Sequence, residues 1–445
     1  MIIMKFGGSS VKNAERINQV KSIVEERLSK KPILVFSAMG DTTDFLLKAG
    51  NDALNGNFSI QHIVDHHLEV AKELQIDSNC YGNLFSELTE LLNGIKLIKE
   101  ISPKSSDYLV SFGERLSVRA ISAFFSKSGI PAKSYDAWEI GLKTTSNFQD
   151  AYPLNETFSN INNFFKDLKN NYTYTPIVTG FIGKDINGSI TTFGRGGSDL
   201  TCSILGASVQ ADEIQVWKDV DGLMTSDPRI VSNAKPVNYV TFDEAAELSY
   251  FGAKVLHPLS MQPAKEYDIP VRVKNSYSPD SKGTLISKEK NYSQGPIKSI
   301  SLKKNITLVD IYSNRMLGAS GFLAKIFTVF DRYEIPIDLL ASSEVSISFT
   351  LSSDKNLEKA KKEIENFADI NIFNKNSIVS LICDVTNSST VLNCAFKRLS
   401  EANLHPKVLS QGASKSNIGM VFEENDAVEA LKVLHNGVLE LYKET

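Results

Sequence analysis

The stretch Phe193-Gly-Arg-Gly-Gly-Ser-Asp199 combines three glycines with a cation and an acid at a predicted strand-to-helix junction. Asn187-Gly188 before it predicts a tight hairpin turn, and the small apolar run from Leu200 onward predicts a helix. Free backbone N–H groups and the positive helix end at such a junction favour an anion. Arg195 adds a guanidinium suited to a carboxylate or a phosphate. Alone, the motif is equally compatible with a glycine-rich turn and a helix-capping Asp199.

A second candidate site lies at the start of the chain. Residues 1–11 (MIIMKFGGSSV) predict a buried strand that runs into two glycines, and a helix over 14–28 and a strand over 32–37 follow. This order is typical of a parallel sheet. Lys5 stands at the end of the first strand, where its ammonium group can bind phosphate oxygens beside exposed amides. The P-loop order is absent, and an isolated lysine here would also fit a solvated strand end.

Other polar segments are expected near these two. Residues 37–44 (SAMGDTTD) are turn-like at the carboxyl end of a strand, which is the usual ligand side of an α/β sheet. Glu114 lies in the first turns of a long predicted helix, where a carboxylate either complements the helix dipole or faces a ligand ammonium group. Residues 212–222 predict a strand that ends in an acidic turn. These elements would position the chemistry of the two glycine motifs.

Composition limits the class of protein and its partners. The 445 residues suggest roughly three domains, and the net charge of −4 without a long basic block argues against nucleic acid as a partner. The four cysteines are scattered, which predicts free thiols in a reducing compartment. No apolar run reaches about 18 residues, so no membrane span is expected. With a strand at the N-terminus and no signal peptide, we predict a cytoplasmic protein.

The order of predicted strands and helices changes after residues 288–294, a polar stretch that we interpret as a linker. Beyond it, strand-like and helical segments follow the order β-α-β-β-α twice, an internal repeat of about 70 residues with the ferredoxin-like plan. The expected domains are therefore 1–290, 297–375 and 376–445. A further possibility is that the third domain is inserted in the second, with residues 438–442 returning as a strand.

Taken together, KFGGSS, SAMGDTTD, SFGERLS, GFIGKDINGSITTFGRGGSD, VWKDVDGLMTSDPR and FGAKVLHP make the chain resemble an aspartate kinase over essentially its whole length. It is similar to the lysine-regulated, monofunctional class. The resemblance implies an α/β fold, in which helices sandwich a largely parallel amino-acid-kinase sheet and two ferredoxin-like ACT domains follow. It also implies the reaction: transfer of the ATP γ-phosphate to the β-carboxylate of L-aspartate, giving 4-phospho-L-aspartate for lysine, threonine and methionine synthesis.

The resemblance further implies roles for individual residues. Lys5 and Asp199 match the catalytic lysine and the acid that orients it. The aspartate site is expected at Ser37, Thr43, Glu114, Arg195 and Ser198. The nucleotide site is expected at Lys5, Gly7, Gly8, Ser9, Lys218, Asp219, Met224, Arg229 and Lys254. Lys218 and Met224 depart from the family pattern, in which threonine and tyrosine are common. Mg²⁺ is expected to bind with ATP, without a ligand cage of the protein's own.

Regulation is implied as well. A lysine effector is expected at Met316, Ser320, Gly321, Phe322, Leu323, Asp338, Ser343 and Glu344. A homodimer formed through the ACT domains, or a tetramer, is the expected assembly. Two other interpretations stay open at this point. One is another carboxylate kinase of the amino-acid-kinase family, and the other is a catalytically inactive amino-acid sensor.

Overall fold

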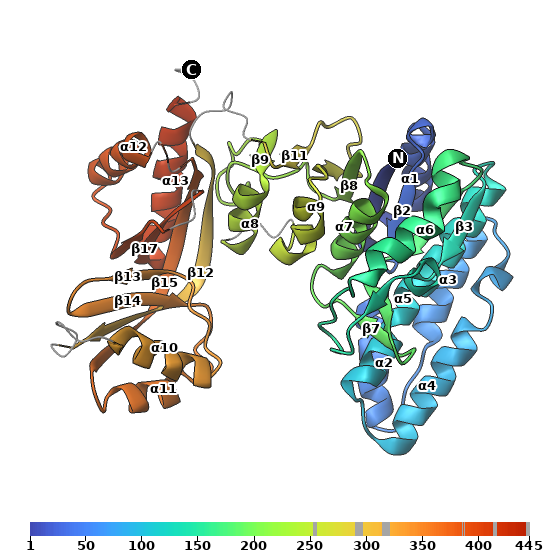
Figure 1. Ribbon diagram of the computed structural model, residues 1–445, viewed down its shortest axis with the longest axis horizontal. Helices are drawn as coiled ribbons and strands as arrows, with labels where there is room; N and C mark the ends of the chain where they lie inside the picture. The colour runs from blue at the N-terminus through green and yellow to red at the C-terminus, as the bar shows by residue number, and fades with distance from the viewer. Residues whose placement is uncertain are drawn as a thin grey trace. The chain divides into compact units, whose positions relative to one another are not determined.

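The computed structural model forms two compact units (Figure 1). It describes residues 1–251, 256–289, 297–313, 321–384, 386, 388–412 and 416–441. Unit 1 comprises residues 1–223, 238–242 and 255–290, and unit 2 comprises residues 224–237, 243–254 and 291–445. Two segments that the sequence assigned to the first domain, 224–237 and 243–254, are therefore part of unit 2. The predicted domain boundaries themselves stay predictions.

Unit 1 is built on an eight-stranded sheet with the order β3-β5-β2-β1-β8-β10-β11-β9. Its strands are β1 (Ile2–Phe6), β2 (Ile33–Phe36), β3 (Ala132–Tyr135), β5 (Thr175–Thr179), β8 (Glu213–Lys218), β9 (Tyr239–Thr241), β10 (Val271–Asn275) and β11 (Thr284–Ser287). Every neighbouring pair is parallel except β10 and β11. The largely parallel sheet predicted from the strand–helix–strand order is confirmed.

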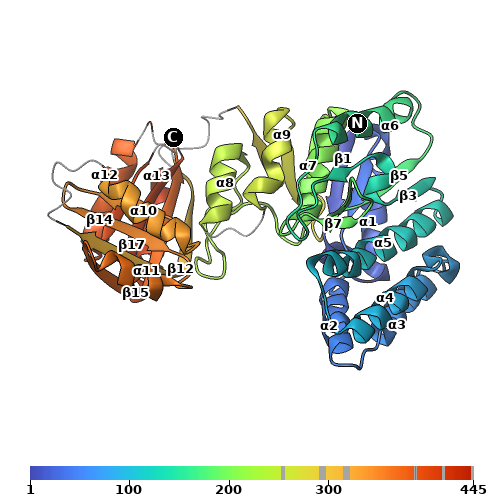
Figure 2. The ribbon, with the colours of Figure 1, turned by 60° about the horizontal axis from the view of Figure 1, so that its bottom comes forward.

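Helices cover both faces of this sheet (Figures 1 and 2). The helices of this unit are α1 (Ala14–Glu25), α2 (Thr42–Leu54), α3 (Gln61–Glu73), α4 (Leu84–Ile98), α5 (Pro103–Lys127), α6 (Glu156–Asn170), α7 (Gly197–Val209) and α9 (Gln262–Glu266). Among them, α2, α3 and α4 contact mainly other helices and not the sheet (Figure 2). Side chains alternate along β1, so Met4 and Phe6 enter the core formed with α1 and α5. Lys5 points to the opposite face, on which α7 packs. That alternation brings the predicted catalytic lysine to the start of α7.

A three-stranded sheet flanks the large one and contains the predicted hairpin. Its strands are β4 (Lys143–Thr144), β6 (Ile182–Asp185) and β7 (Ile190–Thr192). β6 and β7 pair antiparallel around Asn187-Gly188, where Gly188 has φ +79°. The carboxylate of Asp185 accepts hydrogen bonds from the N–H groups of Asn187 and Ser189, at 3.0 and 2.8 Å. This hairpin leads directly into the glycine motif.

Unit 2 contains an antiparallel six-stranded sheet with the order β13-β14-β12-β15-β17-β16. Its strands are β12 (Ile297–Tyr312), β13 (Leu340–Ser342), β14 (Ser346–Leu351), β15 (Asp369–Cys383), β16 (Val408–Ser410) and β17 (Asn417–Glu423). Its helices are α8 (Phe242–Tyr250), α10 (Phe322–Arg332), α11 (Leu357–Ile364), α12 (Ser388–Glu401) and α13 (Glu424–Leu441). The order is that of two ferredoxin-like modules side by side, as predicted.

The two long strands β12 and β15 each serve both modules. The second half of β12 and the first half of β15 share a core with α10 and α11, whereas their other halves share a core with α12 and α13. The pairing of β12 with β15 shifts register between Lys303 and Ile306, which is where the modules meet. Residues 297–303 therefore provide the fourth strand of the second module. A returning C-terminal strand was the expected possibility, but residues 438–441 form the end of α13.

Candidate active site

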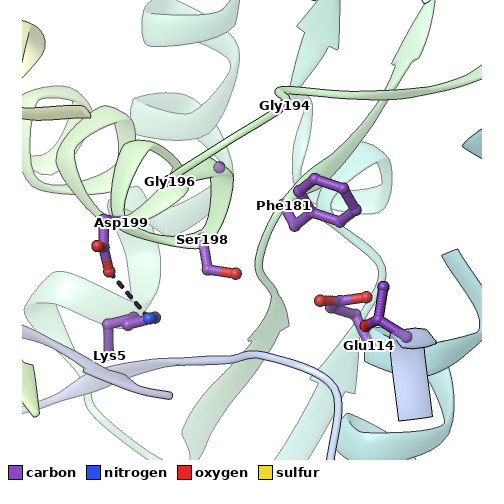
Figure 3. A pocket seen from close by; sticks show the side chains of 9 residues that line it. Lys5, Glu114, Phe181, Gly194, Gly196, Ser198 and Asp199 are labelled. Atoms are coloured by element: carbon purple, nitrogen blue, oxygen red, sulfur yellow. Dashed lines mark ion pairs between the residues drawn. The ribbon is translucent and has the colours of Figure 1, made fainter. Parts of the chain in front are cut away.

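A pocket in unit 1 lies where the carboxyl ends of the parallel strands meet the N-terminus of α7, the ligand side of an α/β sheet (Figure 3). It encloses about 290 Å³ and is lined by Lys5, Thr43, Glu114, Phe181, Gly194, Gly196, Gly197, Ser198 and Asp199. Five of these nine residues were predicted site residues, and the glycines belong to the predicted motif. The fold thus brings together segments that are nearly 200 residues apart in sequence.

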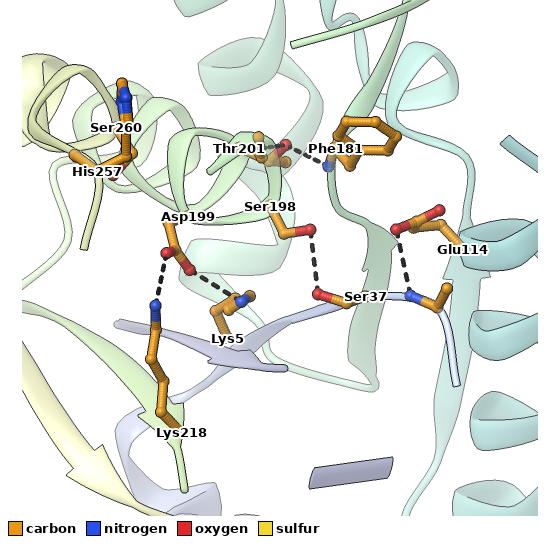
Figure 4. A network of polar contacts seen from close by, with 12 residues as sticks. Lys5, Ser37, Glu114, Phe181, Ser198, Asp199, Thr201, Lys218, His257 and Ser260 are labelled. Atoms are coloured by element: carbon orange, nitrogen blue, oxygen red, sulfur yellow. Dashed lines mark hydrogen bonds and ion pairs between the residues drawn. The ribbon is translucent and has the colours of Figure 1, made fainter. Parts of the chain in front are cut away.

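Asp199 lies between two lysines at one side of the pocket (Figure 4). Its Oδ1 is 2.9 Å from Nζ of Lys5, and its Oδ2 accepts a hydrogen bond of 3.0 Å from Nζ of Lys218. The side chains of Lys5 and Asp199 are only 8% and 7% exposed. Burial opposes ionisation of Asp199, but the two ammonium groups outweigh it and lower the pKa of the carboxyl. Asp199 is therefore an anion that holds two cations in place.

Glu114 faces the pocket from α5. The glycine before it permits this approach, because a Cβ at Gly113 would lie 2.7 Å from the Cβ of Ala38. Oε1 of Glu114 accepts the Ala38 N–H at 3.2 Å, whereas Oε2 is buried without a hydrogen-bond partner among the described residues. Burial raises the pKa of Glu114 to about 8, and the Ala38 N–H and the charge of Lys5 oppose that rise only in part. Among the described residues, the pocket therefore holds a carboxyl group that forms no ion pair.

The glycine loop shapes the third side of the pocket. Gly196 has φ +79°, and a Cβ there would lie 2.7 Å from the Cβ of His257, so both backbone and space require glycine. α7 begins at the next residue without a side-chain cap. Oγ of Ser37 donates to Oγ of Ser198 at 3.1 Å, which joins the end of β2 to the first turn of α7. An uncapped helix start of this kind suits an anion.

Comparison with known proteins identifies this arrangement. The family model "Amino acid kinase family" matches residues 1–275. Aspartokinase 1, chloroplastic, of Arabidopsis thaliana is 44% identical over 455 residues, which cover 98% of this chain and 80% of that protein. The chain belongs to the aspartokinase family. Lysine-sensitive aspartokinase 3 of Escherichia coli is 30% identical, with 99% of each protein covered. The predicted family and the predicted aspartate kinase function are confirmed.

Solved aspartokinase structures share the fold. The structure of E. coli aspartokinase III in complex with aspartate and ADP has a TM-score of 0.79 at 28% identity and covers 99% of this chain and all of that one. Clostridium acetobutylicum aspartate kinase has a TM-score of 0.82 at 29% identity, with 98% and 100% covered. Both likenesses extend through the two ferredoxin-like modules. The aspartokinase fold therefore accounts for both units.

Two residues of the aspartokinase pocket were missed by the sequence analysis. Phe181 lines the pocket with φ +68°, and its N–H donates to Oγ1 of Thr201 at 3.0 Å. Asp107 lies behind the pocket and is 1% exposed. Its Oδ2 accepts the N–H groups of Gln149 and Thr192, both at 2.9 Å. Because a Cβ on Gly194 would lie 2.8 Å from the Gln149 carbonyl oxygen, Asp107 also fixes the surface against which the glycine loop packs.

Other predicted site residues lie outside the pocket lining. Arg195 belongs to the glycine loop, but its side chain is exposed. Gly7 connects β1 to the 3-10 helix Gly8–Val11, which begins with Gly8 and Ser9, and the N–H of Gly7 donates to the Trp217 carbonyl at 3.3 Å. Asp219 is exposed at the end of β8. Met224 and Arg229 belong to unit 2, where Arg229 pairs with Asp227 at 2.7 Å. Lys254 lies outside the described residues.

The predicted effector residues belong to unit 2. Gly321 caps α10 with φ +84°, followed by half-buried Phe322 and exposed Leu323, and Ser343 and Glu344 are exposed between β13 and β14. Met316 and Ser320 lie outside the described residues. Asp338 differs from expectation, because its side chain is 1% exposed and already engaged. Its Oδ1 lies 3.2 Å from Nζ of Lys303 and accepts the Tyr250 hydroxyl at 2.5 Å, and Ser352 donates to its Oδ2.

None of the helices that the structure describes is long and apolar enough to cross a membrane. Within the described residues, no group of three or more His, Cys, Asp or Glu side chains could hold a metal ion.

Proposed function

We propose that the pocket transfers the γ-phosphoryl group of ATP to the β-carboxylate of L-aspartate, giving ADP and 4-phospho-L-aspartate. The observation that carries the proposal is the buried Lys5–Asp199 pair at the start of α7. The substrate carboxylate is already ionised at neutral pH, so the reaction needs no general base. Catalysis then depends on positioning and on neutralising charge as the phosphoryl group moves. Lys5 supplies that charge, and Asp199 holds it in place.

The aspartate substrate would be held by its two α-substituents. Glu114, whose Oε2 has no partner within the described residues, suits the α-ammonium group. Arg195, exposed on the glycine loop, would pair with the α-carboxylate as the loop meets the substrate. Ser37, Thr43 and Ser198 offer hydroxyl groups along the same side of the pocket. This arrangement leaves the β-carboxylate near Lys5.

The nucleotide phosphates would meet Lys5 and the backbone of Gly7, Gly8 and Ser9. Lys218, Asp219, Met224, Arg229 and Lys254 are the further proposed nucleotide contacts. Mg²⁺ supplies charge neutralisation of the ATP phosphates when bound, and Asp199 is engaged by two lysines in this structure. The proposed ion therefore takes its ligands mainly from phosphate and water, as Mg²⁺ commonly does.

A hydroxamate assay tests the reaction, because hydroxylamine traps the acyl phosphate product. Purified protein with Mg·ATP and L-aspartate should form aspartyl hydroxamate, and L-glutamate in its place should form far less. Equal turnover on glutamate would favour another carboxylate kinase of this fold. An absence of product with either amino acid would leave the sensor interpretation instead.

We also propose that lysine is the feedback effector and binds the first ferredoxin-like module. The backbone at Gly321, where α10 begins, suits the effector's α-carboxylate, and Glu344 suits an amine. Asp338 can take part only if it gives up its contact with Tyr250. Tyr250→Phe removes that competing contact, so lysine should inhibit the variant at a concentration about two- to tenfold lower, given about 0.5–1.5 kcal/mol for the hydrogen bond.

The concentration at which each amino acid inhibits is measured by titrating turnover with lysine, threonine and methionine separately. Wild type and Tyr250→Phe should have the same turnover without effector, since the proposed scheme gives Tyr250 no contact with ATP or aspartate. An Asp338→Ala variant that lysine inhibits as strongly as wild type would refute the role of Asp338. Indifference of wild type to millimolar lysine would refute the effector itself.

The assembly and the location remain proposals. We propose a homodimer formed through the modules of unit 2, or a tetramer. In support, Leu323, Leu340 and Val345 of the first module are 39–42% exposed in the single chain. Light scattering on the purified protein, compared with a Leu340→Lys variant, tests this. A cytoplasmic location also stays a prediction, and because the Arabidopsis relative is named chloroplastic, fractionation of the source cells is the test.

A further inference from the structure

Lys218 reaches Asp199 because of its place on β8. In the parallel pairing, Lys5 of β1 lies beside Val216 of β8, and Lys218 follows two residues later on the same face of the sheet. The Lys218 carbonyl accepts hydrogen bonds from the N–H of Ser276, at 2.8 Å, and from its Oγ, at 3.0 Å. The backbone is thus fixed at the residue whose ammonium group contacts Asp199. All of these residues belong to unit 1.

Lys5 and Lys218 contact different oxygens of the Asp199 carboxylate. Lys5 lies on Oδ1 at 2.9 Å and Lys218 on Oδ2 at 3.0 Å, so each oxygen has its own cation. A carboxylate contacted on one oxygen can rotate about its Cβ–Cγ bond, whereas one contacted on both is held. The three groups together also carry a net charge of +1, whereas Lys5 and Asp199 alone would be neutral. A preorganised positive charge stabilises a phosphoryl group in transfer.

We propose that Lys218 is a positioning residue for catalysis, which holds Asp199 through Oδ2 so that Oδ1 keeps Lys5 directed at the reacting phosphoryl group. This inference rests on the phosphoryl transfer proposed above and gives Lys218 a role beyond contact with the nucleotide. The two roles differ in what they change. A lysine that only binds ATP alters the KM for ATP, whereas one that acts through Asp199 alters kcat.

The first test is Lys218→Met, which removes the charge and keeps most of the side-chain length. We expect kcat to fall about tenfold or more, with the KM values for ATP and aspartate within about threefold of wild type. Lys274→Met is the matched control. Lys274 lies on the neighbouring strand β10, its pKa is also lowered by burial, and its Nζ lies 5.0 Å from the ring centre of Trp217. That variant should keep kcat within about twofold of wild type.

The second test is the pH profile of Lys218→Arg. Burial, together with the charge of Lys5, lowers the pKa of Lys218, and Asp199 opposes this shift. Wild-type kcat should therefore decline at alkaline pH as Lys218 loses its proton. Arginine stays protonated, so Lys218→Arg should recover much of the lost kcat and move the decline upward by about one pH unit or more. A merely structural role would not move this profile.

The third test places Lys218→Met on an Asp199→Asn background. If Lys218 acts through Asp199, the second substitution should cost less than about threefold in kcat, compared with about tenfold in wild type. Full additivity, or an unchanged kcat in Lys218→Met with a raised KM for ATP, would overturn the proposal. Absent turnover in wild type would instead refute the proposed reaction. A crystal structure of Lys218→Met tests directly whether Lys218 positions Asp199. An undisturbed Lys5–Asp199 pair in that structure would refute the positioning role.

Discussion

If Glu114 receives the α-ammonium group of aspartate, as proposed above, aspartate binding should depend on pH. Burial raises the pKa of its carboxyl to about 8 in the free protein, so most molecules carry a neutral Glu114 at pH 7. The substrate's α-ammonium group binds the ionised carboxylate of Glu114 far better than the neutral carboxyl group. Aspartate binding must therefore expel a proton, and it should become tighter as the pH rises toward 8.

The size of the effect follows from the raised pKa. If only ionised Glu114 binds, the apparent dissociation constant varies as 1 + 10^(pKa − pH). With a pKa of about 8, aspartate affinity should improve about 25-fold between about pH 6.5 and 8.5, and about 0.9 protons should be released per aspartate at about pH 7. Calorimetry in buffers of different ionisation enthalpy measures both quantities.

Glu114→Gln is the control, because glutamine has the same shape and does not titrate. Its aspartate affinity should be weak and independent of pH over this range, with no proton release. The pH dependence of folding stability has the opposite sign from that of aspartate binding. Neutral Glu114 is favoured in the folded state, so wild-type stability falls as pH rises from the unfolded pKa through about 8, and Glu114→Gln should not show that loss. Wild-type binding without proton release would refute the assignment of Glu114 to the ammonium group.

Three more predictions concern the same pocket. Lys5→Ala should lower kcat on the order of 100-fold or more with smaller changes in KM, and an unchanged kcat would remove Lys5 from catalysis. Arg195→Ala should raise the KM for aspartate by up to about fivefold, since an exposed ion pair contributes up to about 1 kcal/mol, and a change confined to the KM for ATP would contradict this. Asp107→Ala leaves the buried N–H of Thr192 unpaired and removes the acceptor of the part-buried N–H of Gln149, so thermal or urea unfolding should report a loss of about 1–3 kcal/mol, whereas a variant as stable as wild type would show that Asp107 does not anchor the loop.

Local patterns predicted the parts of the pocket that depend on neighbours in sequence. The lysine before two glycines and the glycine motif ending in Asp199 follow strand–turn–helix order, and their meeting follows from the parallel sheet. Glu114 lines the pocket, but it lies in the middle of α5 (Pro103–Lys127) and not in the first helical turns, as the sequence analysis expected. Its raised pKa results from burial, which the sequence near Glu114 does not reveal. Asp107 was missed because its partners lie 42 and 85 residues away. Nothing in the sequence near Phe181 signals its left-handed backbone.

The division of the regulatory modules was harder to predict for a different reason. Residues 297–312 have a strand-like sequence, and they form one strand, β12. The change of module occurs inside it, at the register shift after Lys303, and the sequence is strand-like on both sides of that shift. The order of the modules therefore depends on pairing partners, which the residues of β12 alone do not specify.

Helix α8 follows the unit 1 sheet in the chain and contacts the proposed effector residue Asp338. α8 begins at Phe242, directly after β9 of the unit 1 sheet, yet it packs within unit 2. Oε2 of Glu247 accepts from Asn417 at 3.0 Å, and Phe251 shares an apolar core with strands of both modules. Tyr250, between them, holds Asp338. A ligand that took Asp338 would break a contact of a helix that is continuous with the catalytic sheet, so its binding energy would act on α8 first.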